Sequence, residues 1–343
     1  MKAGWALLLA GCAAVAPGAT PTEQVVELDV TAMGTEVQIV IRADSHTRVK
    51  ALQAAHDAVA QIVRIEALMT DWNESSELSA INRAAGEQPV KVAAELLGLL
   101  QRSKQMSEIT SGAFDVTYAG AGQFWDFKAR PPQVPAPEVI SKAIAFIDYR
   151  ALELDLDAGT AFLTKKGMRI GLGGIAKGYA VDCASELIRK AGFKNHAVKA
   201  GGDMKVSGLW DKKLWSVAIR DPRDRANVVA VLPVSNSAIS TSGDYERFFE
   251  LDGVRYAHII DPRTGYPVQH MRSVTIVSKE SWYSDAIAKG VFVLGVEKGL
   301  KLIEALPEVE AVVIDGNGDL FMSSGLGGVP AEPQPHSKNG KPK

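Results

Sequence analysis

The sequence predicts a mixed α+β fold with antiparallel sheets and packed helices, and three observations support this class. Two pairs of β-rich runs are each separated by a turn-forming segment, Asp252-Gly253 in one case and Asp315-Gly316-Asn317-Gly318 in the other. Apolar residues recur at helical spacing over 48–68 and 93–106. Because hairpins and helices are interleaved along the chain, a doubly wound parallel sheet is not expected.

The other elements are assigned in chain order from local patterning. Alternating apolar and polar residues predict two extended segments within 25–42, with a break at Met33-Gly34-Thr35. Four prolines within 130–137 predict a loop that separates the N-terminal half of the chain from the C-terminal half. A helix is expected over 174–191. Strands are predicted at 161–163, 168–172, 215–220, 228–234, 247–251, 255–260, 273–278, 312–314 and 320–322, and further helices at 282–294 and 298–305.

Length and composition describe an ordinary globular enzyme. The chain has 343 residues, of which 46% are hydrophobic, and this length allows two domains or one large elaborated domain. The net charge of −2 provides no basic surplus to neutralise a phosphate backbone, so nucleic acid is not expected as a partner. One main domain is expected over 25–324, and a subdivision near 130–150 is left open. The Gly-, Pro- and Lys-rich tail 325–343 is predicted to be disordered.

The N-terminus predicts export. Met1-Lys2 is followed by an apolar run over 5–10 and then by Gly11-Cys12, a pattern typical of a signal peptide spanning 1–11. The four residues ending at Cys12 resemble a lipobox, so Cys12 is expected to carry lipid, followed by a tether over 12–24. The alternative is an ordinary small cysteine in a truncated signal. With Cys12 acylated, Cys183 would have no disulfide partner and is expected to be a small core residue.

The glycine-rich run 171–178 is the most informative single segment. It matches the loose pattern G-x-G-x-x-[GA] between an extended segment and a helix, where phosphate would bind free N–H groups at the helix N-terminus. A Rossmann site also requires an acidic residue about twenty positions further on. Asn195, His196 and Lys199 lie near that distance, and none is a carboxylate. This absence argues against a Rossmann dehydrogenase and leaves a tight turn without a ligand as the plainer interpretation.

A longer comparison favours a third interpretation. The string GLGGIAKGYAVD over 171–182 resembles the signature of the ApbE family, the FAD:protein FMN transferases. Seven further blocks resemble elements of that family in the same order. They are MGT at 33–35, the aromatic and SELS segment at 71–83, SGAFDVT at 111–117 with Trp125, GGD at 201–203, STSG at 240–243, HIIDPRTG at 258–265 and SDA at 284–286.

The resemblance implies an ApbE-like, T-fold-related domain and a specific reaction. A Ser or Thr hydroxyl of an acceptor protein attacks the FMN-side phosphorus of FAD, AMP leaves, and FMN remains attached as a phosphoester. The resemblance also implies Mg²⁺. Expected partners are acceptor flavoprotein subunits of exported or membrane redox complexes. The expected location is a lipid-anchored position facing the periplasm or the outer side of the inner membrane. Two alternatives stay open: a Mg-dependent FAD pyrophosphatase giving FMN and AMP, and a non-catalytic FAD-binding lipoprotein.

Carried over residue by residue, the resemblance also implies a site. The residues expected to contact FAD are Met33, Trp72, Ala113, Phe114, Asp115, Gly171, Lys177 and Met271. Asp285 and the backbone of Gly174 are the expected metal ligands, with Lys289 at a third metal-binding position. His258 is the expected general base, because its unperturbed pKa lies near neutrality, and Asp285 is the second catalytic residue.

Each of these assignments has a structural alternative. Asp285 is equally suited to be the N-cap of a helix. His258 is suited to hydrogen bonding within a turn, and Trp72 to a place in the core. In the turn that follows His258, Asp261, Arg263 and Thr264 are placed to hold a phosphate, while Arg263 would also suit a solvated surface.

Three departures from the family pattern affect these expectations. Gly171 stands where the family has an aspartate that contacts the adenosine part of FAD. Lys289 stands where the family's metal motif has threonine. Because residues i and i+4 share a helix face, Lys289 is expected to point towards Asp285. Its ammonium would then either replace the metal or bind the pyrophosphate directly. The segment 118–122, Tyr-Ala-Gly-Ala-Gly, replaces a glycine–proline–leucine stretch.

Overall fold

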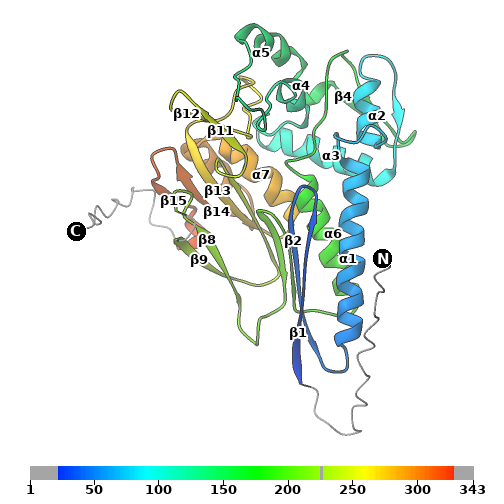
Figure 1. Cartoon of the computed structure of the whole chain (residues 1–343), viewed down its shortest axis with the longest axis vertical. Helices are drawn as coiled ribbons and strands as arrows, with labels where there is room; N and C mark the ends of the chain where they lie inside the picture. The colour runs from blue at the N-terminus through cyan, green and yellow to red at the C-terminus, as the bar shows by residue number, and fades with distance from the viewer. Residues whose placement is uncertain (1–21, 225–226, 328–343) are drawn as a thin grey trace, which may run out of the picture.

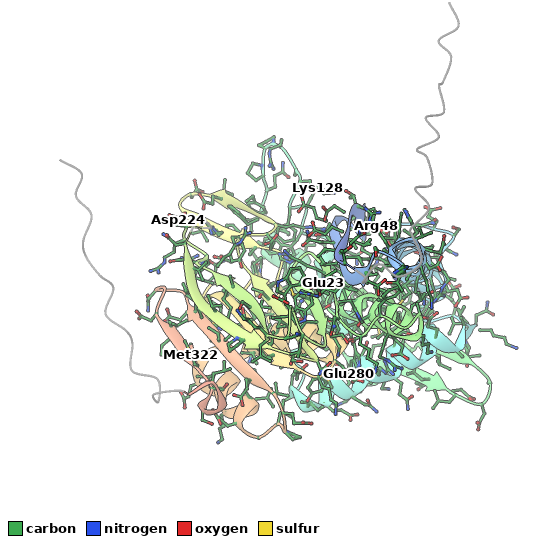
Figure 2. All side chains as sticks on the ribbon, turned by 90° about the horizontal axis from the view of Figure 1, so that it is seen from below. Glu23, Arg48, Lys128, Asp224, Glu280 and Met322 are labelled. Atoms are coloured by element: carbon green, nitrogen blue, oxygen red, sulfur yellow. The ribbon has the colours of Figure 1, made fainter. Side chains whose placement is uncertain are left out.

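The centre of the fold is an eight-stranded antiparallel sheet, seen in a computed structural model that describes residues 22–224 and 227–327. The strand order is β1-β2-β6-β7-β10-β13-β14-β15, so β1 and β15 form the two edges. Seen from below, Arg48 beside the β1 edge and Met322 of β15 lie on opposite sides of the molecule (Figure 2). The strands span Glu23–Ala32, Thr35–Asp44, His196–Ala200, Asp203–Ser207, Ser237–Gly243, Met271–Ser278, Glu310–Asp315 and Leu320–Met322.

Helices α1 (Arg48–Met69), α6 (Ala176–Lys190) and α7 (Ser281–Leu294) form a layer on one face of this sheet (Figure 1). In α1 the buried residues are mostly alanine at helical spacing, which lets α6 pack closely against it. Helix α8 (Val296–Glu304) follows α7 and covers β14. None of the helices within the described residues is both long and apolar enough to cross a lipid bilayer.

The opposite face of the sheet is covered by the hairpin of β8 (Trp215–Arg220) and β9 (Val228–Val234). Successive strand residues point to opposite faces, so the two cores draw on alternate positions. In β6, Ala197 packs in the smaller cluster under β8–β9, whereas Val198 belongs to the main core beneath the helices. The sheet is therefore buried on both faces over its central strands.

Two smaller units extend from one end of the sheet (Figure 1). One combines α2 (Glu77–Arg83) and α3 (Ala94–Ile109) with a three-stranded sheet of β3 (Val90–Lys91), β5 (Thr160–Leu163) and β4 (Leu152–Asp155). The other has its own core, in which Trp125 packs with aromatic residues of the β11–β12 hairpin. Its elements are α4 (Ala119–Gly122), α5 (Pro137–Ala143), β11 (Phe248–Leu251) and β12 (Val254–Ala257). Short 3-10 helices lie at Val116–Tyr118, Ile144–Phe146, Tyr149–Ala151 and Ser324–Leu326.

Most sequence-predicted elements are confirmed, including the α+β class and both hairpins. At the predicted turn, Asp252 and Gly253 have φ of +52° and +77°, which fits a type I′ turn. The strand expected at 168–172 is wrong, because these residues form no sheet ladder. Instead, the amide of Asn82 bonds both the N–H and the carbonyl of Ile170, and the N–H of Gly171 donates to Val116 O.

The ends of the expected domain are described only in part. The predicted signal peptide and Cys12 lie outside the described residues, as do 328–343 of the predicted tail. Strand β1 begins at Glu23, two residues before the expected start of the domain at 25.

Candidate active site

Helices α6 and α7 meet at their N-termini, and each provides a hydrogen-bond acceptor for the other. The N–H of Gly178, in the first turn of α6, donates to Asp285 Oδ2 at 3.1 Å. The N–H of Trp282, in the first turn of α7, donates to Asp182 Oδ2 at 2.9 Å. These N–H groups have no partner within their own helices, and a carboxylate at this position also interacts favourably with the helix dipole.

A glycine makes this approach possible. A Cβ atom at position 178 would lie 2.2 Å from the carbonyl oxygen of Ser281, so only glycine fits without a shift of the backbone. Asp285 lies in the second turn of α7, which begins at Ser281. The alternative that Asp285 is the N-cap of this helix is therefore wrong.

Four charged side chains gather beside this junction and form what we call the charge cluster: Lys177, Asp203, Asp285 and Lys289. Lys177 Nζ lies 3.1 Å from Asp203 Oδ2 and 3.8 Å from Asp285 Oδ2. Lys289 Nζ contacts Asp285 Oδ1, as the i, i+4 spacing predicts. Both carboxylate side chains are at most 2% exposed, whereas the two lysines are 23% and 18% exposed. The lysine side chains therefore form the accessible side of the cluster.

The charges in the cluster determine the protonation of its members. Burial and the neighbouring Asp285 carboxylate raise the pKa of Asp203. Burial alone would raise the pKa of Asp285, but Lys177 and Lys289 outweigh it and hold that pKa below its ordinary value. Although burial opposes it, the two carboxylates raise the pKa of Lys177. The cluster thus presents two ammonium groups and a firmly ionised Asp285 at neutral pH.

His258 lies within electrostatic reach of this cluster. It follows β12, and its backbone N–H donates to Arg247 O. Its Nδ1 is buried and has no hydrogen-bond partner among the described residues, so the ring does not serve the turn. Burial, with Lys289, Lys177 and Arg247 nearby, lowers the pKa of His258 to about 4. The imidazole is therefore neutral near pH 7 and has a nitrogen lone pair available to accept a proton.

The expected FAD-contacting residues near the glycine-rich run are partly brought together. Phe114 lies against Gly174, where a Cβ would be 3.3 Å from Phe114 Cε2. Ala113 precedes Phe114 and is buried with it. Asp115 accepts hydrogen bonds at both carboxylate oxygens, from the backbone and hydroxyl of Thr117 and from the backbone of Tyr149. Its carboxylate therefore holds this loop together.

Two departures from the family pattern, Gly171 and the segment 118–122, are in contact with each other. A Cβ at position 171 would lie 3.2 Å from both the hydroxyl oxygen of Tyr118 and the Cβ of Ala119. Tyr118 thus occupies the space that a side chain at 171 would need. Burial and the charge of Asp71 raise the pKa of Tyr118 to about 12, despite the opposing effect of Lys177 and Arg247. The phenol is therefore neutral and a potential hydrogen-bond donor.

The remaining expected FAD residues differ in exposure. Trp72 is 88% exposed, so the alternative that it is a core residue is wrong. Met33 is half-buried at the β1–β2 turn, and next to it Gly34 O accepts from Arg247 NH2 at 3.3 Å. Met271 is 1% exposed and packs in the main core. No interaction in the described structure joins Trp72 or Met271 to the charge cluster.

The sequence blocks are brought together by contacts between distant segments. A Cβ at Gly201 would meet Thr35 Oγ1 at 2.8 Å, and one at Gly202 would meet Thr241 O at 2.3 Å. These close approaches join the MGT, GGD and STSG blocks. Trp125 Nε1 donates to Gly265 O at 2.9 Å, and this hydrogen bond joins the SGAFDVT block, with its Trp125, to the HIIDPRTG block.

Two residues of these blocks make contacts that the sequence did not specify. Asp203, the acid of the GGD block, is a member of the charge cluster to which sequence analysis gave no role. Its place in the GGD block was the only feature of the sequence that could have indicated a role for Asp203 in the site. The Arg263 side chain is 48% exposed, as the alternative of a surface arginine requires, and its guanidinium fork binds Asp261 Oδ1 and Oδ2 at 2.8 and 2.6 Å.

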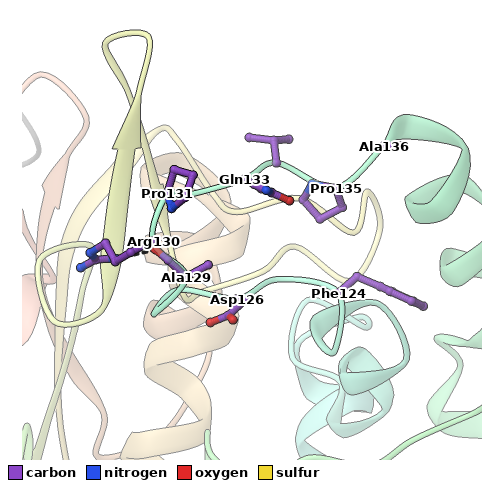
Figure 3. Close-up of a pocket in the computed structure, with 9 residues that line it drawn as sticks. Phe124, Asp126, Ala129, Arg130, Pro131, Gln133, Pro135 and Ala136 are labelled. Carbon is purple, nitrogen blue, oxygen red and sulfur yellow. Dashed lines mark hydrogen bonds between the residues drawn. The ribbon is translucent and has the colours of Figure 1, made fainter.

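An open pocket of about 420 Å³ lies elsewhere, along the proline-rich loop (Figure 3). Phe124, Asp126, Arg130, Pro131 and Pro135 are among the residues that line it. A neighbouring hollow of about 380 Å³ shares Arg130 and continues to the β11 strand. No member of the charge cluster lines either hollow.

Comparisons with known proteins show which family this chain resembles. Residues 33–313 match the profile of the ApbE family. An FAD:protein FMN transferase from Vibrio cholerae serotype O1 is 34% identical over 328 residues, covering 93% of this chain and 94% of that protein. One from Treponema pallidum is 33% identical over 83% of this chain and 84% of its own length.

Solved structures show the same fold. The ApbE protein of Thermotoga maritima superposes with a TM-score of 0.82 at 31% identity, covering 89% of this chain and 98% of that one. The flavin transferase ApbE of Vibrio cholerae gives a TM-score of 0.77 at 29% identity, covering 88% of this chain and 98% of that one.

Proposed function

Because this chain belongs to the ApbE family, we propose that it is an FAD:protein FMN transferase. It moves FMN from FAD to a hydroxyl of an acceptor flavoprotein and releases AMP. The observation that carries the proposal is the charge cluster, in which Lys177 and Lys289 present two ammonium groups beside the unpartnered Nδ1 of His258. A pyrophosphate diester carries two negative charges, and its oxygens can accept charge-assisted hydrogen bonds from these two ammonium groups.

The proposed chemistry assigns one task to each group. The acceptor hydroxyl oxygen attacks the FMN-side phosphorus while the bond from that phosphorus to the AMP oxygen breaks. His258 accepts the hydroxyl proton, and AMP leaves with the electron pair of the broken bond. Burial and the nearby positive charges together lower the pKa of His258, and bound pyrophosphate would offset the second of these effects, so the imidazole becomes a better base once FAD is in place. Lys177 and Lys289 orient the phosphates.

The groups beside Asp285 decide whether the expected metal fits this site. Mg²⁺ requires near-octahedral oxygen ligands, and Asp285 and the Gly174 carbonyl are the expected protein donors. Asp285 Oδ1 instead contacts the ammonium of Lys289, and Oδ2 accepts from the Gly178 N–H and faces Lys177. Within 22–224 and 227–327, no three His, Cys, Asp or Glu side chains group together as metal ligands. The donors present do not suit Mg²⁺, and no step of the proposed transfer is routed through it.

The remaining site and cellular expectations are part of the same proposal. Trp72, Met33, Phe114 and Lys177 are proposed to contact FAD, and the exposed indole of Trp72 is free to stack on one of its rings. Cys12 is proposed to carry the lipid that anchors an exported protein to a membrane, supported by the apolar run and the residues that precede it. The acceptors would then be subunits of exported or membrane redox complexes.

Incubation of the purified protein with FAD and Mg²⁺, with and without a Thr-bearing acceptor peptide, tests the function. AMP together with a flavin-fluorescent peptide identifies the transferase. AMP without labelled peptide identifies the pyrophosphatase, and intact bound FAD identifies a non-catalytic binder. His258→Asn should still bind FAD but should form AMP about a hundredfold more slowly, because it lacks the base. His56→Asn, on the exposed surface of α1, is the matched control and should remain active.

A further inference from the structure

One lysine side chain contacts both residues that are expected to bind the metal. A Cβ at Gly174 would lie 3.5 Å from Lys289 Cγ and 3.8 Å from its Cδ, so the aliphatic part of Lys289 packs directly against Gly174. The same side chain ends with its ammonium on Asp285 Oδ1. Lys289 therefore reaches from Gly174 to Asp285, the two residues expected to hold the ion.

The electrostatics of the site also disfavour a second cation. Lys177 already lies 3.8 Å from Asp285 Oδ2, so each oxygen of this fully buried carboxylate faces an ammonium group. A divalent ion at Asp285 would meet two positive charges within a few ångströms. To admit the ion, Lys289 would have to leave Asp285 and lose the partner of its charge.

The ion pair also has an accessible side, which a purely structural pair in the core would lack. Asp285 is fully buried, but Lys289 is 18% exposed and its charge reaches His258, whose Nδ1 has no partner. An ammonium at this position can donate to a phosphate oxygen while it stays bound to Asp285, because it carries three N–H donors. Lysine binds phosphate as a point charge in this manner.

We propose that the Lys289 ammonium is a permanent replacement for a divalent metal at Asp285, and that this protein binds FAD and transfers FMN without Mg²⁺. The claim that FMN transfer proceeds without Mg²⁺, the catalytic half of this inference, rests on the proposed function. The claim that no divalent metal binds at Asp285, the metal-binding half, does not depend on it. Substitution of Lys289 by threonine should shorten the side chain, open the space between Gly174 and Asp285, and provide a hydroxyl oxygen in place of the ammonium.

The metal-binding half is tested with Mn²⁺, a paramagnetic substitute for Mg²⁺, titrated into the full chain and followed by electron paramagnetic resonance. The wild-type protein should leave Mn²⁺ free in solution, whereas Lys289→Thr should bind one equivalent. Lys298→Thr, on the exposed surface of α8, is the matched control and should behave as wild type. Stoichiometric Mn²⁺ binding by the wild-type protein that Asp285→Asn abolishes would overturn the proposal, and this measurement does not require any variant to be active.

The catalytic half is tested by FAD affinity and AMP release in EDTA and in Mg²⁺. The wild-type protein should give the same values in both media. In EDTA, Lys289→Thr should bind FAD at least ~tenfold more weakly, the scale of one charge-assisted phosphate contact, and Mg²⁺ should restore its activity. Lys289→Arg should remain independent of metal.

A wild-type protein that releases AMP only with Mg²⁺ would contradict the inference and leave the function intact. No AMP from any variant in either medium would contradict the function, and the Mn²⁺ titration would still decide the metal question.

Discussion

His196 is a fully buried histidine whose charge state follows from its two hydrogen bonds. Its Nδ1 lies 3.0 Å from Phe193 O, which can only accept, so Nδ1 carries the hydrogen. Its Nε2 lies 2.8 Å from Ser185 Oγ and, in the neutral ring, accepts from that hydroxyl. Burial lowers the pKa of His196 to about 4, against the opposing effect of the hydrogen bonds. This histidine therefore supports the fold in its neutral form.

The free energy of unfolding should consequently fall on mild acidification. Between the unfolded pKa near 6.5 and the folded pKa of about 4, the unfolded chain binds the extra proton, so stability decreases as pH decreases. Between pH 7 and pH 5 the loss from His196 is about 2 kcal/mol. Urea unfolding at both pH values should show a smaller difference for His196→Asn than for wild type. His46→Asn, at an exposed site, should keep the wild-type difference. An unchanged pH difference in His196→Asn would refute this account.

Some contacts of the site could be predicted from the sequence and others could not. The contact of Lys289 with Asp285 was predictable, because helix geometry places i and i+4 on one face. The contact of Asp203 with Lys177 was not, because α6 and β7 meet only in the folded chain. The structural use of the Asp115 carboxylate was also not predictable, since it depends on the distant backbone of Tyr149.

At the scale of the element, the crossing of α6 and α7 depends on one missing side chain. Gly178→Ala would place a methyl group 2.2 Å from the carbonyl oxygen of Ser281, so the helices must separate. We expect a loss of about 1–3 kcal/mol in the free energy of unfolding and weaker FAD binding, because the Gly178 N–H helps to hold Asp285. Gly98→Ala in α3 is the matched control, since a Cβ there meets nothing within 4 Å. That control should be neutral or stabilising by up to about 1 kcal/mol, and equal effects of the two substitutions would contradict the packing argument.

Element prediction succeeded where the pattern was local. The outer helices and the β11–β12 and β14–β15 hairpins carry their own periodicity and turn residues, and the structure confirms them. The central strands β6, β7 and β10 were missed as strands. They carry Lys, His, Ser and Thr in place of a β-branched run, so the local pattern did not indicate a strand. The expected strand over 168–172 was wrong because side chains from elsewhere satisfy its backbone.

At the scale of the whole molecule, eight short sequence blocks are joined into one framework by contacts that only the fold creates. Gly201 approaches Thr35, Trp125 bonds Gly265, and Gly178 bonds Asp285, each across a large separation in sequence. Periodicity and turn signals could give the α+β class but not these pairings, because nothing local specifies which strands become neighbours. The order of the blocks carried that information, through their resemblance to a family.

The cellular position of the whole chain leads to the last prediction, which concerns Cys12. If Cys12 is acylated, several buried acyl chains hold the protein on a membrane, since each methylene contributes about 0.8 kcal/mol. The full chain produced in a bacterial host should therefore separate with membranes and enter the detergent phase of a Triton X-114 extraction. Cys12→Ser should move to the aqueous phase and still bind FAD, because every residue of the charge cluster lies within the described domain. Cys183→Ser, which removes the half-buried thiol of α6, is the matched control and should stay in the detergent phase. A wild-type chain found in the aqueous phase would exclude the lipid anchor but would not affect the proposed reaction. The anchor determines which acceptors the enzyme meets, whereas the charge cluster determines how FAD reacts.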